Sequence, residues 1–323
     1  MSPKSGPGSK QETKQIQPEQ KKKRKRASEI RYAFSLARRN PVVLSGSIIA
    51  IVTIILTFLS GVIVQPDLWK VTVPVNQLCW NNPSFNWGIS NVLVCPDSST
   101  VHLLGTDYYG RDLLSMIVLS LPTDLEIAFA VVLSAFAIGV ILGSVSAYAG
   151  GKLDETILRI TDVFFAIPPL ILAIVILSTR GRSLPMLALA VLITWWPIYV
   201  RLVRSQVLAE KGKPYAEALR AIGAGRLRIL FFHLLPNSIY PILVQLTLDI
   251  GGVILTFSSL MFLGFSPNPL LPELGNLVSE GINYVNTAPW LIIFPGLTIL
   301  IIALGFNLLG DGVRDLLDPR LRR

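Results

Sequence analysis

An apolar stretch of 23 residues without a charge, Val42–Val64, constrains this chain more than any other feature. A helix of that length rises about 35 Å, which exceeds the roughly 30 Å of hydrocarbon in a bilayer. Hydrophobic residues make up 51% of the chain and charged residues 15%, and the mean hydropathy is +0.57. These values are typical of membrane proteins rather than soluble domains. We therefore predict an all-α, polytopic integral membrane protein whose first transmembrane helix covers residues 41–64.

Five further apolar stretches bring the predicted number of transmembrane helices to six. They run approximately over Thr123–Ala149, Ile157–Ser178, Pro185–Val200, Ser238–Leu263 and Trp290–Leu309. We expect Pro122, Asp124 and Glu126 at the N-terminus of the second helix, where a fixed φ and the helix dipole favour them. Pro168 and Pro169 should bend the third helix.

Small residues recur at every fourth position along the second span: Ala135, Gly139, Gly143, Ala147 and Gly151. Apolar side chains gain little from meeting each other in lipid, so such a stripe lets a neighbouring helix approach closely. The pattern predicts that the second span is buried in a helix bundle.

The basic residues are distributed unevenly between the predicted loops. With both ends of the chain inside the cell, only Lys70, Arg111, Arg180 and Arg182 of the 29 lysines and arginines fall outside. The positive-inside rule favours this orientation. We therefore expect a multi-pass protein of the plasma membrane with cytoplasmic N- and C-termini and a C-terminal tail over residues 311–323.

Residues 1–40 form a polar segment with a basic run at Lys21–Arg26. Its composition predicts a disordered cytoplasmic tail. Similar runs occur in nuclear-targeting and nucleic-acid-binding segments, but six predicted spans argue against a nucleic-acid partner. Next to a membrane helix, the run is expected to contact anionic lipids and to fix the topology.

Residues 65–121 form a polar extracytoplasmic segment that carries both cysteines of the chain, Cys79 and Cys95. A disulfide between them would stabilise the segment by about 3 kcal/mol in the chain-entropy estimate. The alternative is a pair of free thiols.

Catalysis by this chain is not expected. The sequence has no G-x-x-x-x-G-K-[ST] nucleotide-binding motif, and neither His102 nor His233 has a metal-ligand partner at usable spacing. Asp249 is the only carboxylate that we place well inside a span, where a charge costs about 2.5–3.5 kcal/mol on insertion scales. It either lines a translocation route or makes a structural hydrogen bond to a neighbouring helix.

A basic hairpin, Lys213–Pro236, separates the fourth and fifth spans. Pro214 suits the first position of a helix, and Gly223 suits its end. The helix between them places its apolar residues at helical spacing on one stripe: Tyr215, Ala218, Leu219 and Ile222. So short a helix is marginal in water by itself, and it must pack against anionic lipid or a partner protein.

The sequence of this hairpin resembles the EAA loop of ATP-binding-cassette (ABC) importer permeases. Glu217-Ala218, Gly223 six residues after Glu217, and Leu235-Pro236 carry the resemblance, and Leu219 departs from the usual Ala. The resemblance implies a coupling helix that sits in a cleft of an ATPase subunit. The implied coupling residues are Tyr215, Glu217, Ala218, Leu219, Arg220, Ile222, Gly223 and Pro236.

Four more passages resemble the second permease subunit of dipeptide and oligopeptide ABC importers. They are HLLGTDYYGRD (His102–Asp112), AGGKLDETILRITD (Ala149–Asp162), WPIYVRLVR (Trp196–Arg204) and FNLLGDGVRDLLDPR (Phe306–Arg320). Phe257 stands where the family usually has an acidic residue, so Phe257 and Asp249 are the residues that we expect along the translocation path. Leu274 likewise replaces the usual Trp. The first passage either forms a turn with an Asp112–Arg111 pair or shapes a docking surface for a solute-binding protein.

This resemblance implies a prokaryotic, ATP-driven importer. Its permease core would cover residues 122–310 and its coupling loop residues 203–236. The implied partners are a homologous second permease, two ATPase subunits that bind ATP and Mg, and an extracytoplasmic solute-binding protein. Peptides are the implied substrate, with oligosaccharides or nickel as alternatives. A secondary transporter or membrane scaffold is the alternative from another class.

Overall fold

The computed structural model describes residues 41–64, 103–107, 111–286 and 288–317. Within these ranges the chain is helical except for turns, connections and a single isolated bridge between Thr106 and Asp112. The main helices are α2 (Pro41–Ile63), α4 (Leu113–Ala149), α5 (Gly151–Phe165), α6 (Pro169–Arg180), α7 (Leu184–Lys211), α10 (Leu235–Leu260) and α12 (Trp290–Leu317). The prediction of an all-α fold is confirmed.

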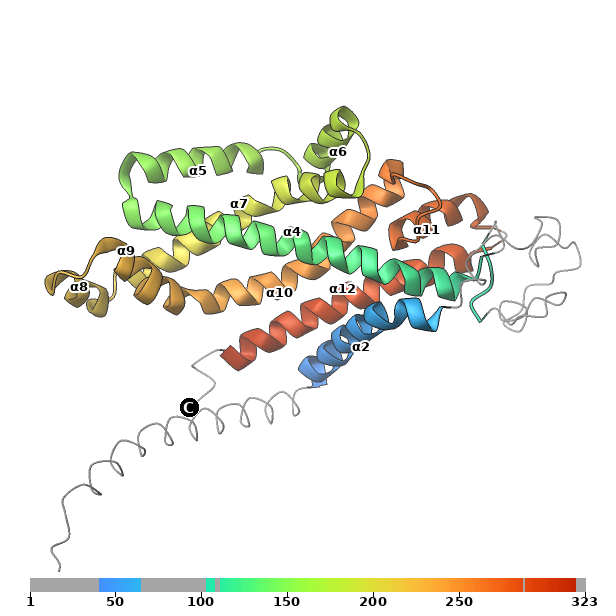
Figure 1. Cartoon of the computed structure of the whole chain (residues 1–323), viewed down its shortest axis with the longest axis horizontal. Coiled ribbons are helices and arrows are strands. Elements are labelled where there is room, and N and C mark those ends of the chain that lie inside the picture. The colour runs from blue at the N-terminus through green and yellow to red at the C-terminus, as the bar shows by residue number, and fades with distance from the viewer. Residues whose placement is uncertain (1–40, 65–102, 108–110, 287, 318–323) are drawn as a thin grey trace, which may run out of the picture.

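Shorter elements close the two ends of the bundle. α8 (Pro214–Ala221), α9 (Arg226–Ile229) and the π-helix η3 (Leu230–Leu234) join α7 to α10. At the opposite end, η4 (Met261–Phe265), α11 (Leu274–Gly281) and η5 (Ile282–Tyr284) join α10 to α12. Figure 1 shows α8 and α11 at opposite ends of the long axis, and these are called the α8 end and the α11 end below.

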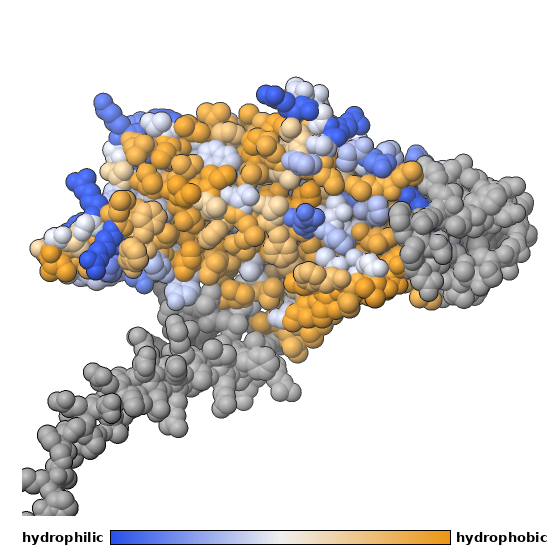
Figure 2. Space-filling view, viewed as in Figure 1, coloured by the Kyte–Doolittle hydropathy of each residue, from blue (hydrophilic) through white to orange (hydrophobic). Residues whose placement is uncertain are grey.

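Five helical segments are long and apolar enough to span a membrane: Pro41–Ile63, Leu113–Ala149, Leu184–Lys211, Arg226–Phe265 and Trp290–Asp315. The pair α5 and α6 makes a sixth only when its two parts are counted together across an 83° bend. Figure 2 shows apolar residues over most of the bundle and hydrophilic residues gathered at the α8 end and beside α6. The predicted six spans hold on this count.

The bend predicted at Pro168 and Pro169 in the third span, Ile157–Ser178, is confirmed and is sharper than expected, because the helix stops after Phe165 and restarts at Pro169. Pro168 has ψ 131°, an extended conformation that a following proline imposes on the residue before it. The two consecutive prolines therefore break this helix rather than merely bend it.

The predicted start of the second span is also wrong. α4 begins at Leu113, where the Asp112 carboxylate accepts a 2.7 Å hydrogen bond from the Ser115 amide and caps the helix. Pro122 lies inside α4, so Asp124 and Glu126 stand within the helix and not at its N-terminus. Asp249 is therefore not the only carboxylate inside a span.

The part of the small-residue stripe that lies in α4 is buried and packs against a neighbouring helix, α7, as predicted, whereas Gly151 begins α5 and is exposed, so its place in the stripe is wrong. A Cβ added to Gly139 would lie 2.1 Å from the Cβ of Tyr199, and one added to Gly143 would lie 2.6 Å from the Val200 carbonyl oxygen. α4 and α7 can approach this closely only without side chains at these two positions. α12 lies between α10 and α2 and completes the core.

Candidate functional site

The helix predicted over Pro214–Ile222 is present as α8, with Ile222 as its C-cap. Gly223 has φ +76°, a left-handed conformation in which glycine has no steric penalty. Its amide donates to the Arg220 carbonyl at 3.0 Å, and the Ala224 amide donates to the Leu219 carbonyl at 3.1 Å. These bonds satisfy the last carbonyls of the helix and turn the chain back toward the bundle.

The predicted apolar stripe of α8 is only partly exposed, because the bundle covers part of it. Tyr215 and Leu219 are half-buried against the core of the chain, and Ala216 between them is fully buried. Ala218 is exposed, and Ile222 is 78% exposed. Bundle packing therefore occupies one side of α8 and leaves the other side open.

Glu217 and Arg220 lie on the exposed part of α8, and Pro236 is exposed at the start of α10. The sequence reading missed further apolar residues near them. Leu227 is 71% exposed and Phe232 76% exposed, next to half-exposed Phe231. Together with Ile222 they are exposed apolar side chains of the segment between α7 and α10, and these residues are called the α8-end patch. The sequence RLRILFF, residues 226–232, already shows apolar residues within the basic hairpin and could have predicted this patch.

Tyr215 attaches α8 to both neighbouring long helices. Its hydroxyl donates to Glu210 Oε2 of α7 at 2.7 Å and accepts a long hydrogen bond from Asn237 Nδ2 of α10 at 3.4 Å. Lys213 Nζ pairs with Glu210 Oε1 at 2.5 Å. Burial raises the pKa of the Tyr215 hydroxyl, and the hydrogen bond to Glu210 raises the pKa of Lys213. Both groups therefore remain donors.

Lys211 attaches the same region to α4. Its ammonium donates to the Ala147 carbonyl at 2.9 Å and to the Tyr148 carbonyl at 3.0 Å, both in the last turn of α4. A cation at a helix C-terminus also meets the negative end of the helix dipole. Arg220 Nη2 of α8 donates to the Lys211 carbonyl at 3.3 Å. α8 is thus connected to α4 as well as to α7 and α10.

Two of the sequence passages bind each other next to this region. Arg204 of α7 donates from Nε and Nη2 to both oxygens of Asp154 in α5, each at 2.6 Å, and Ser146 also donates to this carboxylate. Arg201 pairs with Asp162 and lies 4.1 Å from the centre of the Phe165 ring. The sequence contained both partners, but only the fold brings them together.

The structure places Asp249 and Phe257 in α10, away from α8. Phe257 is fully buried, and Asp249 is 8% exposed. Gln245 Nε2 donates to Asp249 Oδ1 at 2.9 Å, and Tyr199 and Trp195 of α7 adjoin the same carboxyl. The carboxyl therefore sits at the contact of α7 with α10.

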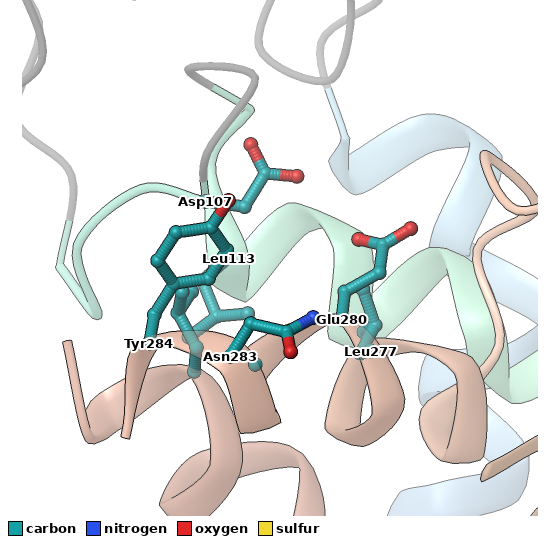
Figure 3. A pocket seen from close by; sticks show the side chains of 8 residues that line it. Asp107, Leu113, Leu277, Glu280, Asn283 and Tyr284 are labelled. Atoms are coloured by element: carbon teal, nitrogen blue, oxygen red, sulfur yellow. The ribbon is translucent and has the colours of Figure 1, made fainter. Parts of the chain in front are cut away.

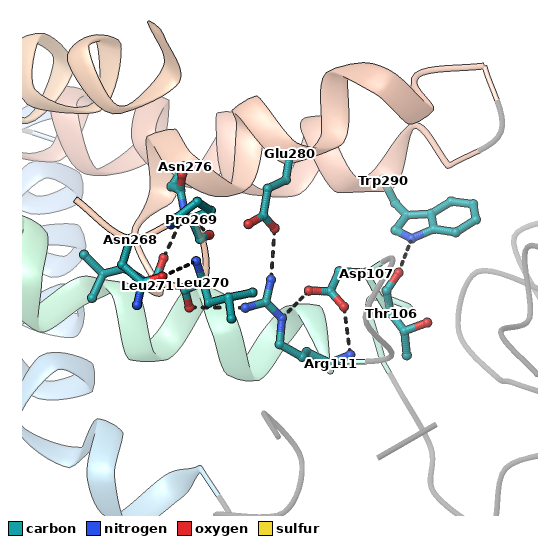
Figure 4. A network of polar contacts seen from close by, with 10 residues as sticks. All are labelled: Thr106, Asp107, Arg111, Asn268, Pro269, Leu270, Leu271, Asn276, Glu280 and Trp290. Atoms are coloured by element: carbon teal, nitrogen blue, oxygen red, sulfur yellow. Dashed lines mark hydrogen bonds and ion pairs between the residues drawn. The ribbon is translucent and has the colours of Figure 1, made fainter. Parts of the chain in front are cut away.

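At the α11 end, the first sequence passage forms a polar network (Figure 4). Arg111 pairs with Asp107 at 2.5 Å and with Glu280 of α11 at 2.9 Å, and its Nη1 donates to the Leu270 carbonyl at 3.2 Å. Asp112 caps α4 through its hydrogen bond with the Ser115 amide, while Arg111 pairs with Asp107 and Glu280. The network fastens the segment before α4 to α11.

A small pocket of about 130 Å³ lies beside this network, and Figure 3 shows Asp107, Glu280, Asn283 and Tyr284 around it. Burial raises the pKa of Glu280 to about 7, although Arg111 opposes this shift. Cys79 and Cys95 lie outside the described residues, so their disulfide stays a prediction. Among the described residues, no cluster of three His, Cys, Asp or Glu side chains could hold a metal ion.

A comparison with known proteins identifies the family. The family model described as "Binding-protein-dependent transport system inner membrane component" matches residues 136–323. This chain belongs to that family. The family and the apolar helices together indicate a multi-pass inner-membrane permease. The resemblance to ABC importer permeases is confirmed, and the alternative of a secondary transporter or scaffold has no support.

Curated relatives of this permease are named for dipeptide transport. The dipeptide transport system permease protein DppC of Haemophilus influenzae is 43% identical over 222 residues, which cover 69% of this chain and 75% of the relative. DppC of Alkalihalophilus pseudofirmus is 36% identical over 292 residues, which cover 90% of each chain. A probable D,D-dipeptide permease of Escherichia coli is 41% identical over 222 residues, which cover 69% of this chain and 74% of the relative.

The fold of this permease is similar to that of a solved ABC transporter. One chain of a structure of the MetNI methionine ABC transporter in an inward facing conformation superposes on this permease with a TM-score of 0.54. The match covers 63% of this chain and 97% of the other, at 20% sequence identity. This likeness shows the permease fold.

Proposed function

We propose that this chain is the permease subunit through which an ATP-driven importer takes up dipeptides or other short peptides. The names of its relatives support this substrate class, and the relative that is 36% identical covers 90% of the chain. The importer would combine this chain with a homologous second permease, two ATPase subunits and an extracytoplasmic solute-binding protein. Oligosaccharides and nickel have no support among these relatives.

The observation that carries the proposal is the division of α8 into two sides. One side is held by Tyr215 and buried Ala216, whereas Ala218 and Ile222 face outward. Because one side of α8 is packed on the bundle, a partner bound to the exposed side could transmit its own movement to the bundle. The α8-end patch next to it adds apolar surface of the kind that marks protein interfaces.

In this mechanism the ATPase binds the exposed side of α8, with Glu217, Arg220 and Gly223 at the edges of the contact. Movement of α8 then reaches α7 through Glu210, α10 through Asn237 and α4 through Lys211. The ATPase can drive this change only if it binds α8 more tightly in one arrangement of the bundle than in the other.

The orientation follows the distribution of charge. The α8 end carries Lys152, Arg201, Arg204 and the basic residues of the hairpin, and we place it in the cytoplasm with both termini. The α11 end then faces the solute-binding protein. ATP and Mg belong to the ATPase subunits, so this chain performs no chemistry itself. Asp249 and Phe257 would line the path only in a state in which α7 and α10 separate.

The test uses the complete importer in proteoliposomes with the ATPases inside. We expect Ala218→Arg to abolish peptide uptake and to reduce co-purification of the ATPase, because an arginine enlarges and charges the exposed side of α8. Thr156→Arg makes the same change at an exposed position of α5 and should leave both measurements unchanged. Normal uptake by Ala218→Arg, or purification of intact importer without an ATPase, would contradict the proposal.

A further inference from the structure

Two buried carboxyl groups meet between α4 and the start of α11. Asp124, in the first third of α4, is 1% exposed, and Glu273, the N-cap of α11, is fully buried. The two side chains adjoin each other where α11 contacts α4. Two ionised carboxylates cannot occupy such a site without strong repulsion and loss of solvation.

Glu273 is well supplied with hydrogen-bond donors. It accepts from the Gly275 amide at 3.0 Å, the Asn276 amide at 2.7 Å and the Ser258 hydroxyl of α10 at 3.3 Å. A Cβ on Gly275 would lie 2.1 Å from the Ser258 carbonyl oxygen, so the N-terminus of α11 is pressed against α10. The backbone thus holds the Glu273 carboxyl in place and can support its charge.

Asp124 has the opposite environment. Neither of its oxygens meets a donor of hydrogen-bond geometry within the described part of the chain, although the Leu274 amide lies nearby. An ionised carboxylate in this position would lose its hydration without compensation, at a cost of several kcal/mol. A protonated carboxyl would instead donate its O–H to Glu273.

We propose that Asp124 and Glu273 form a proton-binding site, in which a carboxyl O–H of Asp124 bonds to Glu273 and fastens α11 to α4. The ligand of this site is a proton. Because α11 also carries Glu280, the partner of Arg111, the site controls how firmly the whole α11 end is closed. It adds a regulatory element that is independent of the contact between α8 and an ATPase.

The groups that face the site are few. α10 contributes the neutral hydroxyl of Ser258, η4 and α2 have no ionisable residue, and η5 has only Tyr284. On α11 itself, Glu280 lies two turns away and is bound to Arg111. The charged residues within the described part of α12 lie near its far end: Asp311, Arg314 and Asp315. The two carboxyls therefore act mainly on each other.

Burial raises the pKa of Glu273 to about 7. A carboxyl whose pKa is raised by folding stabilises the folded state fully below its unfolded pKa, and this stability is lost as pH rises through the folded pKa. Because Asp124 keeps the proton that it donates, the group that titrates near pH 7 is Glu273, and the stability contributed by its neutral form is lost as the pH rises through about 7.

The first experiment is infrared difference spectroscopy of the purified complex in H₂O and D₂O at about pH 8. We expect a C=O band of a protonated carboxyl that shifts in D₂O and is lost in Asp124→Asn. The amide of that variant can still donate to Glu273, so the fold should persist. Glu126→Gln changes an exposed carboxyl of the same helix and should keep the band. A band that is unchanged in Asp124→Asn would overturn the proposal.

A second measurement remains informative if Asp124→Asn fails to fold. The midpoint of thermal unfolding of the wild-type complex should fall between about pH 5 and about pH 8, and Glu273→Gln should flatten this dependence. A Glu273→Gln curve parallel to the wild type would also overturn the proposal. Both readouts are independent of ATPase binding, so they can fail while the proposed transport function stands.

Discussion

Arg204 of α7 donates two hydrogen bonds of 2.6 Å to Asp154 of α5, one to each carboxylate oxygen. The guanidinium fork and the carboxylate match in geometry, and the contact is only partly exposed, at 27% and 17% of the two side chains. This pair fixes the exposed helix α5 to the helix that leads into α8. The position of α5 therefore depends on this side-chain contact as well as on its chain connection.

Arg204→Lys should weaken this attachment, because a lysine keeps the charge but cannot form both bonds. We expect a loss of about 1.5–3 kcal/mol, the range for hydrogen bonds to charged groups, and we would measure it as a lower unfolding midpoint of the purified complex. Arg159→Lys changes an arginine of an exposed pair, with Arg159 and Glu155 76% and 68% exposed, and should have almost no effect. Equal effects of the two substitutions would refute a special role for Arg204.

Gly139→Ala tests the close contact of α4 with α7. The added Cβ would meet the Tyr199 Cβ at 2.1 Å, and the helices would have to move apart. We expect a destabilisation of about 1–3 kcal/mol and a lower yield of folded protein, as for an overpacked core. Gly296→Ala in α12 adds its Cβ where no atom lies within 4 Å, and it should be neutral. If both variants unfold at the wild-type midpoint, the α4–α7 contact is looser than described.

Local patterns predicted the elements whose determinants lie close together in the sequence. Pro214 and Gly223 fix the ends of α8 through φ preferences, and the spacing of Gly139 and Gly143 marks the face of α4 that meets α7. Neither prediction required knowledge of a distant partner. The charge distribution and the apolar runs likewise report on single segments.

Features that depend on two distant segments could not be predicted in the same way. Asp124 was expected at a helix N-terminus, because the nearby Pro122 is typical of the first position of a helix. No residue near Asp124 in the sequence indicates that it meets Glu273. Leu219 was placed on a docking surface, because an apolar stripe does not say whether the bundle or a partner covers it. Tertiary packing decides both cases.

The pH dependence of stability should have a contribution from Glu280. Burial raises its pKa to about 7, so the stability from its neutral form is complete below about pH 4.5 and is lost as pH rises through about 7. Glu280→Gln keeps a neutral partner for Arg111 and should flatten the unfolding midpoint between about pH 5 and about pH 8. Glu126→Gln should follow the wild-type slope, and the same slope in Glu280→Gln would show that Glu280 does not titrate in this range.

Asp249→Asn tests whether the buried carboxyl between α7 and α10 serves transport. An asparagine can still accept a hydrogen bond from Gln245, so the importer should assemble normally. We expect uptake to fall at least about tenfold, which corresponds to about 1.4 kcal/mol, if the charge is needed when the path opens. Ser259→Ala removes an exposed hydroxyl from the same helix and should transport normally. Full transport by Asp249→Asn would assign this carboxyl a structural role alone.

Gly223→Pro and Gly225→Pro form a matched pair that tests the turn after α8. Proline fixes φ near −65°, which is incompatible with φ +76° at Gly223 but fits φ −62° at Gly225, the N-cap of α9. We expect Gly223→Pro to displace the end of α8 and to uncouple ATP hydrolysis from peptide uptake, with hydrolysis retained and uptake lost. Gly225→Pro should remain coupled. The measurement is the ratio of peptide transported to ATP hydrolysed, and equal ratios for the two variants would mean that transport does not depend on the geometry of this turn.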